Sequence, residues 1–442
     1  MTVAHDALHD PGSARAALRI RDVDPPSRAE IRAGAGHIRV GIAAWTEPTL
    51  VKPGVFYPQG VTSAEDRLRY YASRFSLAEV DSTYYALPAH QMAELWVERT
   101  PDDFVFDVKA HALMTDHPTE TKRLPKAIRE ALPPDQAAKP RVYAKDLPPD
   151  VLDEVWRLFR DALEPLHASG KLGVILLQYP PWFVPSRTNA QTVVATRARL
   201  EGLPFAVEFR HRSWLSGRMA KRTPEFLAEH DIPMVIVDAP PGMKSSLPAT
   251  PLVTSSRLAI VRLHGRREET WEQRNEITSE RYRYLYDESE LSEWVQPVLD
   301  VAAQAPETHV IFNNCYGNYA PTNAIEFSAL LDAARARMEG RRMSDVLEVR
   351  TVSRKTARDG KHEISPDTAA RLRRLAMPLN VIVDGVRDRG SVASMPCTCR
   401  PEVHEHWFIQ SEALRSLEAG REATTSLTAD GTTIDIRTSA AR

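Results

Sequence analysis

The 442-residue chain has little cysteine, no long apolar run and no excess of either charge. Three cysteines in so long a chain exclude a disulfide framework, so we expect the reducing environment of the cytoplasm. No apolar run approaches the ~20 residues of a membrane-spanning helix, and the first residues lack the apolar core of a secretory signal. The net charge of −2 gives no general preference for nucleic acid or a membrane surface.

Short apolar runs alternate with helical patterns from about residue 37 to residue 335. Most runs are rich in Val, Ile and Phe, as parallel strands buried on both faces are. About eight strand–helix units in roughly 300 residues favour an α/β fold, a TIM (β/α)8 barrel, with a doubly wound open sheet as the alternative. The predicted strands are 37–45, 77–82, 103–110, 172–179, 204–210, 232–239, 258–264 and 309–315.

The pattern changes after residue 335, which predicts a second domain. We predict a flexible leader at residues 1–36, the barrel at 37–340 and a small α+β or β-barrel domain at 345–442. In the last segment, "TTSLTADGTTIDIRT", the Ala-Asp-Gly turn between Thr-rich runs predicts a hairpin. Two long connections, 111–150 and 239–257, are expected on the same rim of the barrel, where long loops are usually functional or disordered.

Charged residues interrupt the strands near their C-terminal ends. In "PFAVEFRHRSW" (204–214), Glu208 and Arg210 alternate with Val207 and Phe209, so the charged pair should point into the barrel. Burying these charges unpaired would cost several kcal/mol. Because barrel active sites form at the C-terminal ends of the strands, we predict one site there, in which acids and bases neutralise one another. The same alternation adds Glu79, Asp81, Asp107, Lys109, Gln178, Asp238, Arg262, His264, Asn313 and Asn314.

The first of three candidate functions is acid/base chemistry on a small anionic substrate that bears phosphate or carboxylate, such as a sugar or nucleotide. Arginine binds such groups through two parallel hydrogen bonds. Glu208 or Asp238 would be the general base, and His264 or Lys109 the acid. The predicted substrate-binding residues are Asp81, Tyr84, Gln178, Arg210, Arg262, Arg266, Asn313 and Asn314.

Two alternatives remain open. One is a metal-dependent hydrolase or isomerase, in which carboxylates and imidazoles at the same mouth ligate a divalent cation. The neighbouring cations compete with such a metal; its candidate ligands are Glu79, Asp81, Glu208, Asp238, His211 and His264. The other alternative is a non-catalytic nucleic-acid-binding module, which the basic stretch from 335 to 361 favours weakly, because such stretches are often solvated helix ends.

Seven motifs resemble those of the YecE-like family, a domain-of-unknown-function family (number 72) of TIM-barrel proteins. The resemblance covers about residues 38–335 and implies the same barrel, but the family has no established activity and supplies no reaction. The C-terminal ~100 residues lie outside it. The motifs are "GIAAWTEPTLVKPGVFYPQG", "AEVDSTYYALP", "FVFDVKA", "GVILLQYPPWF", "AVEFRHRSWL", "VRLHGR" and "VIFNNCYGNYAPTNA".

The C-terminal domain contains a cluster of cysteine and histidine, "CTCRPEVHEH". Cys397, Cys399, His404 and His406 are residue types that bind zinc, although the C-x-C spacing differs from that of a common zinc finger. Plain strand alternation is the alternative reading. For Cys315, at the end of the last barrel strand, a buried small residue is expected rather than a nucleophile, because no base is evident beside it.

Overall fold

The computed structural model describes residues 31–33, 36–52, 56–273, 278–375, 378–398, 402–428 and 432–439. The chain divides into two compact units, residues 1–333 and 334–442. Most of the predicted leader, 1–36, lies outside the described residues, but β1 (Ile31–Ala33) is a strand that pairs antiparallel with the start of β2. No helix in the described ranges is long and apolar enough to cross a membrane.

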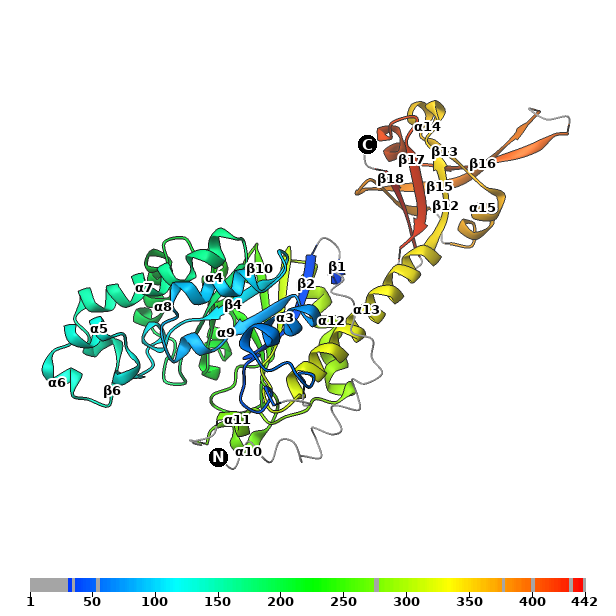
Figure 1. Cartoon of the computed structure of the whole chain (residues 1–442). Coiled ribbons are helices and arrows are strands. Elements are labelled where there is room, and N and C mark those ends of the chain that lie inside the picture. Colours follow the sequence, from blue (N-terminus) through cyan, green and yellow to red (C-terminus); the bar gives the residue numbers. More distant parts are fainter. Residues whose placement is uncertain are drawn as a thin grey trace. The chain divides into compact units, whose positions relative to one another are not determined.

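The first unit is a nearly closed barrel of parallel strands, which confirms the predicted TIM barrel (Figure 1). The last barrel strand pairs in parallel with the first, and a bridge between Val207 and Met234 joins the two ends of the sheet. Each strand overlaps a predicted run. In chain order they are β2 (Gly36–Ala43), β3 (Leu77–Val80), β4 (Val105–Lys109), β7 (Leu172–Gln178), β8 (Phe205–Glu208), β9 (Val235–Asp238), β10 (Leu258–Leu263) and β11 (Glu307–Phe312).

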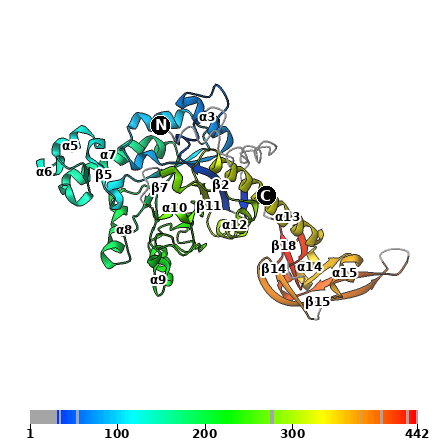
Figure 2. The same cartoon turned by 90° about the horizontal axis from the view of Figure 1, so that it is seen from below.

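Helices surround the strands of this barrel (Figure 2). The sequence sets where they begin: the Ser63 hydroxyl accepts a hydrogen bond from the backbone N–H of Asp66 at 2.9 Å and caps the first of them. The connection from β9 to β10, residues 239–257, contains no helix, so this β/α unit is incomplete. The helices are α3 (Ala64–Arg74), α4 (His90–Glu98), α7 (Pro149–Ala168), α8 (Arg187–Arg199), α9 (Met219–Glu229), α12 (Glu288–Ala302) and α13 (Tyr319–Asp345).

The long connection at 111–150 is an ordered insertion with short elements of its own. Its two strands, β5 (Thr119–Glu120) and β6 (Arg141–Val142), pair antiparallel. Because it follows β4 and 239–257 follows β9, both connections leave the C-terminal ends of parallel strands on the same side of the barrel. Its helical turns are η2 (Ala112–Thr115), η3 (Thr121–Arg123), α5 (Lys126–Ala131), α6 (Pro134–Ala137) and η4 (Ala144–Asp146). Other short elements of the first unit are η1 (Ser82–Tyr84), η5 (Arg212–Leu215), α10 (Glu268–Trp271) and α11 (Thr278–Arg281).

The second unit is an α+β domain with a curled seven-stranded sheet, in the order β12-β17-β18-β14-β15-β16-β13 (Figure 1). The predicted hairpin is present: β17 and β18 pair antiparallel, and its turn residues 429–431 lie outside the described residues. The apolar core includes Val381, Ile409 and Ile434. The elements are β12 (Val346–Thr351), α14 (Arg354–Asp359), β13 (Lys361–Ile364), α15 (Pro366–Leu372), β14 (Leu379–Val383), β15 (Val386–Cys397), β16 (His404–Gln410), η6 (Glu412–Ser416), β17 (Glu422–Leu427) and β18 (Thr433–Thr438).

Candidate functional site

A fully buried arginine links three strands across the barrel. Arg262 on β10 donates two hydrogen bonds to Glu79 on β3, from Nε at 2.9 Å and from Nη2 at 2.7 Å. Its Nη1 donates to Glu208 on β8. All three side chains have 0% exposure. Barrel interiors are usually filled by branched apolar side chains, so this charged layer, Glu79–Arg262–Glu208, is an unusual filling in which one cation is shared by two carboxyl groups.

Two more side chains complete the hydrogen bonding of Glu208. Gln178 Nε2 donates to its Oε1 at 2.7 Å, and His264 Nε2 donates to the same oxygen at 3.1 Å. Asn313 Nδ2 contacts His264 Nδ1 at 2.8 Å, so both ring nitrogens of His264 are engaged. Burial lowers the pKa of His264 to about 4, despite the opposing effect of Glu208, so the imidazole is neutral at pH 7.

The two carboxylates of the charged layer differ in acidity. Burial raises the pKa of Glu79 to about 7, and Arg262 and Lys109 reduce this rise. Burial also acts on Glu208, but Arg262 and His264 together hold its pKa well below the usual range. Glu79 is therefore the carboxylate of this layer that takes up a proton near neutral pH.

Above this layer, charged and aromatic side chains reach the mouth of the barrel. Lys109 Nζ donates to Asp81 Oδ1 at 2.9 Å and lies 4.8 Å from the centre of the Tyr84 ring. Arg210 Nη1 lies 3.5 Å from Glu208 Oε1, and its guanidinium stacks 4.6 Å from the centre of the Trp271 ring. The side chains of Lys109 and Arg210 are 12% and 11% exposed, so both are held by protein contacts and only a small part of each is open to solvent.

A histidine of the 111–150 insertion stands beside these two cations. His117 packs edge-on against Tyr84, with ring centres 5.3 Å apart, and against Trp182 at 5.7 Å. Burial, with the positive charges of Lys109 and Arg210, lowers the pKa of His117 to about 3. The ring is therefore neutral, and its environment reports a positive potential at this part of the mouth.

A cavity of about 620 Å³ opens next to the Lys109–Asp81 pair, where β2, β3 and β11 end. It has the size and the mostly apolar lining of small-molecule sites. Aromatic side chains form much of its wall, and Asp81 and Asn313 contribute polar groups. The residues that line it include Trp45, Asp81, Tyr85, Trp96, Tyr282, Asn313 and Cys315.

Asp238 belongs to a separate arrangement. Both of its oxygens accept hydrogen bonds from Arg266 Nε, at 3.1 and 3.0 Å, and Tyr286 donates to Oδ2 at 2.6 Å. Asp238 and Arg266 line a second cavity of about 450 Å³ with Arg212 and the 239–257 connection. The structure therefore divides the predicted site residues between two neighbouring places rather than one.

The predicted site residues also differ in how deeply their side chains are buried. Glu208, Arg262 and His264 have at most 1% exposed side chains, so they lie beneath the mouth and support it. Asn314 is also buried and donates to Tyr284 O and Asn323 Oδ1, both at 2.8 Å. The predicted residues whose side chains reach solvent at the mouth are Asp81, Tyr84, Lys109, Gln178, Arg210, Arg266 and Asn313.

Cys315 is partly buried and lines the 620 Å³ cavity, so the expected full burial is not observed. Its Sγ contacts Ala43 O at 3.0 Å, and burial raises the pKa of the thiol well above its usual value. A protonated, hydrogen-bonded thiol is a poor nucleophile.

Several residues at the mouth are not among those predicted from the sequence. Tyr282 and Trp271 come from the connection between β10 and α12, and Tyr286 from the same segment orients Asp238. His117 lies in the 111–150 insertion. The aromatic-rich stretch "RYRYLY" (281–286), in the connection between β10 and α12, is the feature that could have indicated Tyr282 and Tyr286.

The opposite end of the barrel holds another buried ionic pair. His309 Nδ1 donates to both oxygens of Asp107, at 3.0 and 2.9 Å. Asp107 points into the barrel as predicted, but at the N-terminal end of the strands, where barrels use conserved positions for stability rather than catalysis.

The carboxylates and imidazoles predicted as metal ligands are poorly placed to bind a metal ion. The Glu79 and Glu208 oxygens already accept hydrogen bonds from Arg262, Gln178 and His264. His211, a further predicted ligand, uses its Nδ1 for the Ser213 hydroxyl at 2.6 Å. The carboxylate chemistry there is that of an internal ion pair.

The fold and the charged mouth define a TIM-barrel protein of a recognised class. The chain belongs to the family described as "Protein of unknown function DUF72", which matches residues 39–346. This confirms the predicted YecE-like membership, and the C-terminal domain lies almost wholly beyond the matched residues.

Named relatives and solved structures agree. UPF0759 protein YunF of Bacillus subtilis (strain 168) is 28% identical over 298 residues, which cover 67% of this chain and 95% of YunF. UPF0759 protein YecE of Escherichia coli (strain K12) is 31% identical over 132 residues, 28% of this chain and 44% of YecE. A DUF72 family protein from Enterococcus faecalis V583 superposes with a TM-score of 0.53 at 28% identity, covering 67% of this chain and 95% of that one. One from Thermotoga maritima MSB8 gives 0.51 at 30% identity, covering 67% and 99%.

Proposed function

We propose that this chain binds a small anionic ligand, bearing phosphate or carboxylate, at the mouth of the barrel and acts on it by acid/base chemistry. The observation that carries the proposal is the pair of cations at the mouth. Lys109 and Arg210 are fixed by carboxylates and aromatic rings, and each keeps about a tenth of its side chain exposed, 12% and 11%. Cations held in position in this way bind an anion without first being ordered, which favours affinity.

The charge balance supports an anion. Lys109 and Arg210 lie at the mouth with Asp81, and the buried layer of Arg262, Glu79 and Glu208 lies directly beneath them. Burial raises the pKa of Glu79 to about 7, so this carboxyl offsets less of the positive charge of Lys109 and Arg262 than an ordinary carboxylate would. A smaller negative charge there favours the approach of an anionic ligand.

The 620 Å³ cavity would take the uncharged part of the ligand. Its aromatic wall suits stacking against a sugar or a base, and the Asp81 and Asn313 side chains can accept or donate hydrogen bonds. The phosphate or carboxylate would lie toward Lys109, which pairs with the Asp81 carboxylate at the cavity edge.

The proposed role of each residue follows from whether its side chain reaches the cavity or is closed off from solvent. Asp81 reaches the cavity and is proposed as the general base. Lys109 keeps its proton, because Asp81 and Glu79 outweigh burial and raise its pKa, so it stabilises negative charge rather than transferring a proton. Glu208 and His264, closed off from solvent, are proposed as positioning residues. In this scheme Asp238 and Arg266 act at the second cavity or not at all.

The alternatives are weaker on this geometry. Metal-dependent chemistry at the mouth would require a cation to displace Arg262 from its two carboxylates. Nucleic-acid binding remains a prediction from the 335–361 stretch, and a cytoplasmic location remains a prediction from the cysteine content.

Titration calorimetry tests the proposal with inorganic phosphate, ribose 5-phosphate and citrate as probes. A hydrogen bond to a charged group is worth about 1.5–3 kcal/mol, so Arg210→Gln should weaken binding of the best probe by about 10- to 150-fold. Arg69→Gln is the matched control: Arg69 is an exposed arginine of α3 paired with Glu65, and its loss should leave binding unchanged. Circular dichroism would confirm that both variants fold.

Two outcomes would refute the proposal. One is wild-type protein that binds none of the three anions at millimolar concentration. The other is Arg210→Gln protein that binds as tightly as the control variant.

A further inference from the structure

The C-terminal domain gathers three metal-binding side chains on one hairpin, far in sequence from the barrel mouth. β15 and β16 pair antiparallel, with Cys397 opposite His404 and Met395 opposite His406. His404 and His406 are two residues apart on one strand, so they share a face. The pairing register therefore brings a thiol and two imidazoles together.

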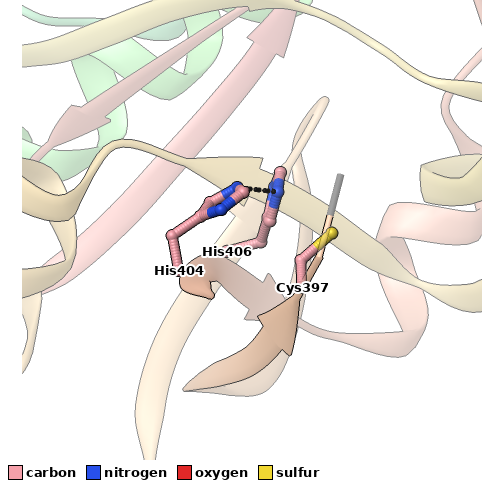
Figure 3. Close-up of side chains that lie close together, drawn as sticks. All are labelled: Cys397, His404 and His406. Atoms are coloured by element: carbon pink, nitrogen blue, oxygen red, sulfur yellow. Dashed lines mark hydrogen bonds between the residues drawn. The ribbon is translucent and has the colours of Figure 1, made fainter. Parts of the chain in front are cut away.

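The ligand atoms converge. The Cys397 sulfur and one nitrogen from each of His404 and His406 all lie within 4.8 Å of one another. The two Nε2 atoms are 3.1 Å apart. Figure 3 shows the rings of both histidines turned toward each other, with the Cys397 sulfur beside them. Tetrahedral zinc with bonds of about 2.0–2.3 Å separates its ligand atoms by roughly 3.3–3.6 Å, so small side-chain movements would close this site.

The hydrogen bonds of the Nδ1 atoms of His404 and His406 also favour a metal site. His406 Nδ1 lies 2.6 Å from Glu363 Oε1 on β13, and His404 Nδ1 lies 3.1 Å from Glu402 O. Both neighbours are acceptors, so both Nδ1 atoms carry the proton and both Nε2 atoms present lone pairs. Two lone pairs at this distance repel unless a proton or a cation lies between them. Histidines that bind metal show the same arrangement, with Nδ1–H donated to a carboxylate or a carbonyl.

We propose that Cys397, His404 and His406 bind one zinc ion, with Glu363 orienting His406. A mixed sulfur and nitrogen set suits zinc better than the oxygen-preferring Mg²⁺ or Ca²⁺. All three side chains are half-buried, which leaves a path for the metal. Within the part of the chain that the structure describes, no other group of three or more such residues converges in this way. Cys399, the fourth residue of the predicted cluster, lies outside the described residues.

Cobalt substitution in the full chain tests this site. Protein freed of metal by a chelator should bind about one equivalent of Zn²⁺ in calorimetry. With Co²⁺ it should show the near-ultraviolet absorption of a thiolate–cobalt bond. Cys397→Ser should remove that absorption and weaken Zn²⁺ binding by at least about 100-fold, whereas Cys315→Ser, the matched control in the barrel, should change neither.

Glu363→Gln provides a milder variant that keeps all three ligands. Loss of such an outer partner typically lowers metal affinity about 10- to 100-fold, and the thiolate–cobalt absorption should persist. The proposal is overturned if the wild-type chain takes up no Zn²⁺, if its cobalt form lacks the thiolate absorption, or if Cys397→Ser binds Zn²⁺ as tightly as Cys315→Ser. The first two results come from the unmodified protein and do not depend on how a variant folds.

Discussion

Replacing Arg262 by methionine would test the charged layer directly. The substitution removes the positive charge and the three hydrogen bonds to Glu79 and Glu208 while keeping much of the side-chain volume. Glu208 would retain Gln178 and His264 as donors. Glu79 would lose the guanidinium that neutralises it in a position with no exposed surface.

The size of the effect follows from the loss of the buried ion pair, and its pH dependence follows from the acidity of Glu79. Removal of one partner of a buried pair typically costs about 3–5 kcal/mol. The variant can avoid a bare buried charge by keeping this carboxyl protonated, whereas burial raises its wild-type pKa from 4.5 to about 7. At and below pH 7 the wild-type carboxyl is largely protonated as well, so the two proteins share the cost of that proton. Above pH 7 only the wild-type carboxyl ionises, so the defect should grow by up to about 1.4 kcal/mol per pH unit.

Urea denaturation at pH 5, 6, 7 and 8, followed by tryptophan fluorescence, provides the assay, since every tryptophan except Trp407 lies in the barrel. Arg157→Met is the control: this exposed arginine of α7 pairs with Glu154 and Asp161, and its loss should leave the midpoint unchanged. The reasoning fails if Arg262→Met unfolds at the wild-type urea concentration at pH 7, or if its defect grows as the pH falls.

Two further predictions concern the N-terminal end of the barrel. Burial opposes the charge of His309, but Asp107 and Glu307 raise its pKa to about 9 from 6.5. The stability from this pairing is fully present below pH 6.5 and is lost as the pH rises to about 9, up to about 3 kcal/mol; His309→Gln should abolish that loss in urea titrations, and an unchanged pH profile would count against it. Gly173→Ala would place a Cβ 2.4 Å from Asp107 Oδ1 and 2.9 Å from His309 Cε1. It should destabilise the barrel by about 1–3 kcal/mol, and an unaltered melting temperature would contradict this.

Much of the fold is predictable because it depends on local patterns. Val207 and Phe209 alternate with charged residues, and parallel strands buried on both faces leave apolar runs that stand out from the helices. The missing helix at 239–257 and the small sheet within 111–150 were not predicted. Proline-rich segments carry little periodicity, and a two-residue strand such as Thr119–Glu120 depends on its partner across space.

The sequence indicates which side chains of the candidate site face into the barrel, but not how deeply each one is buried. Strand alternation indicates that Glu208 and Arg262 face inward, yet it does not distinguish a buried ion pair from an accessible catalytic group. That difference depends on how far each residue lies from the end of its strand and on which side chains cover it. Lys109 is the last residue of β4 and reaches the mouth, whereas Asp107, two residues earlier, lies in the layer of His309.

The link from Arg262 to both Glu79 and Glu208 has a consequence for how this family diverges. Loss of Arg262 alone leaves two carboxylates in the interior without this cation, whereas loss of one glutamate still leaves a balanced pair. Homologous barrels that change Arg262 are therefore expected to change both glutamates with it, and single changes at either glutamate should be tolerated better. The arginine should thus be inherited together with at least one of its partners, even where the rim above varies freely.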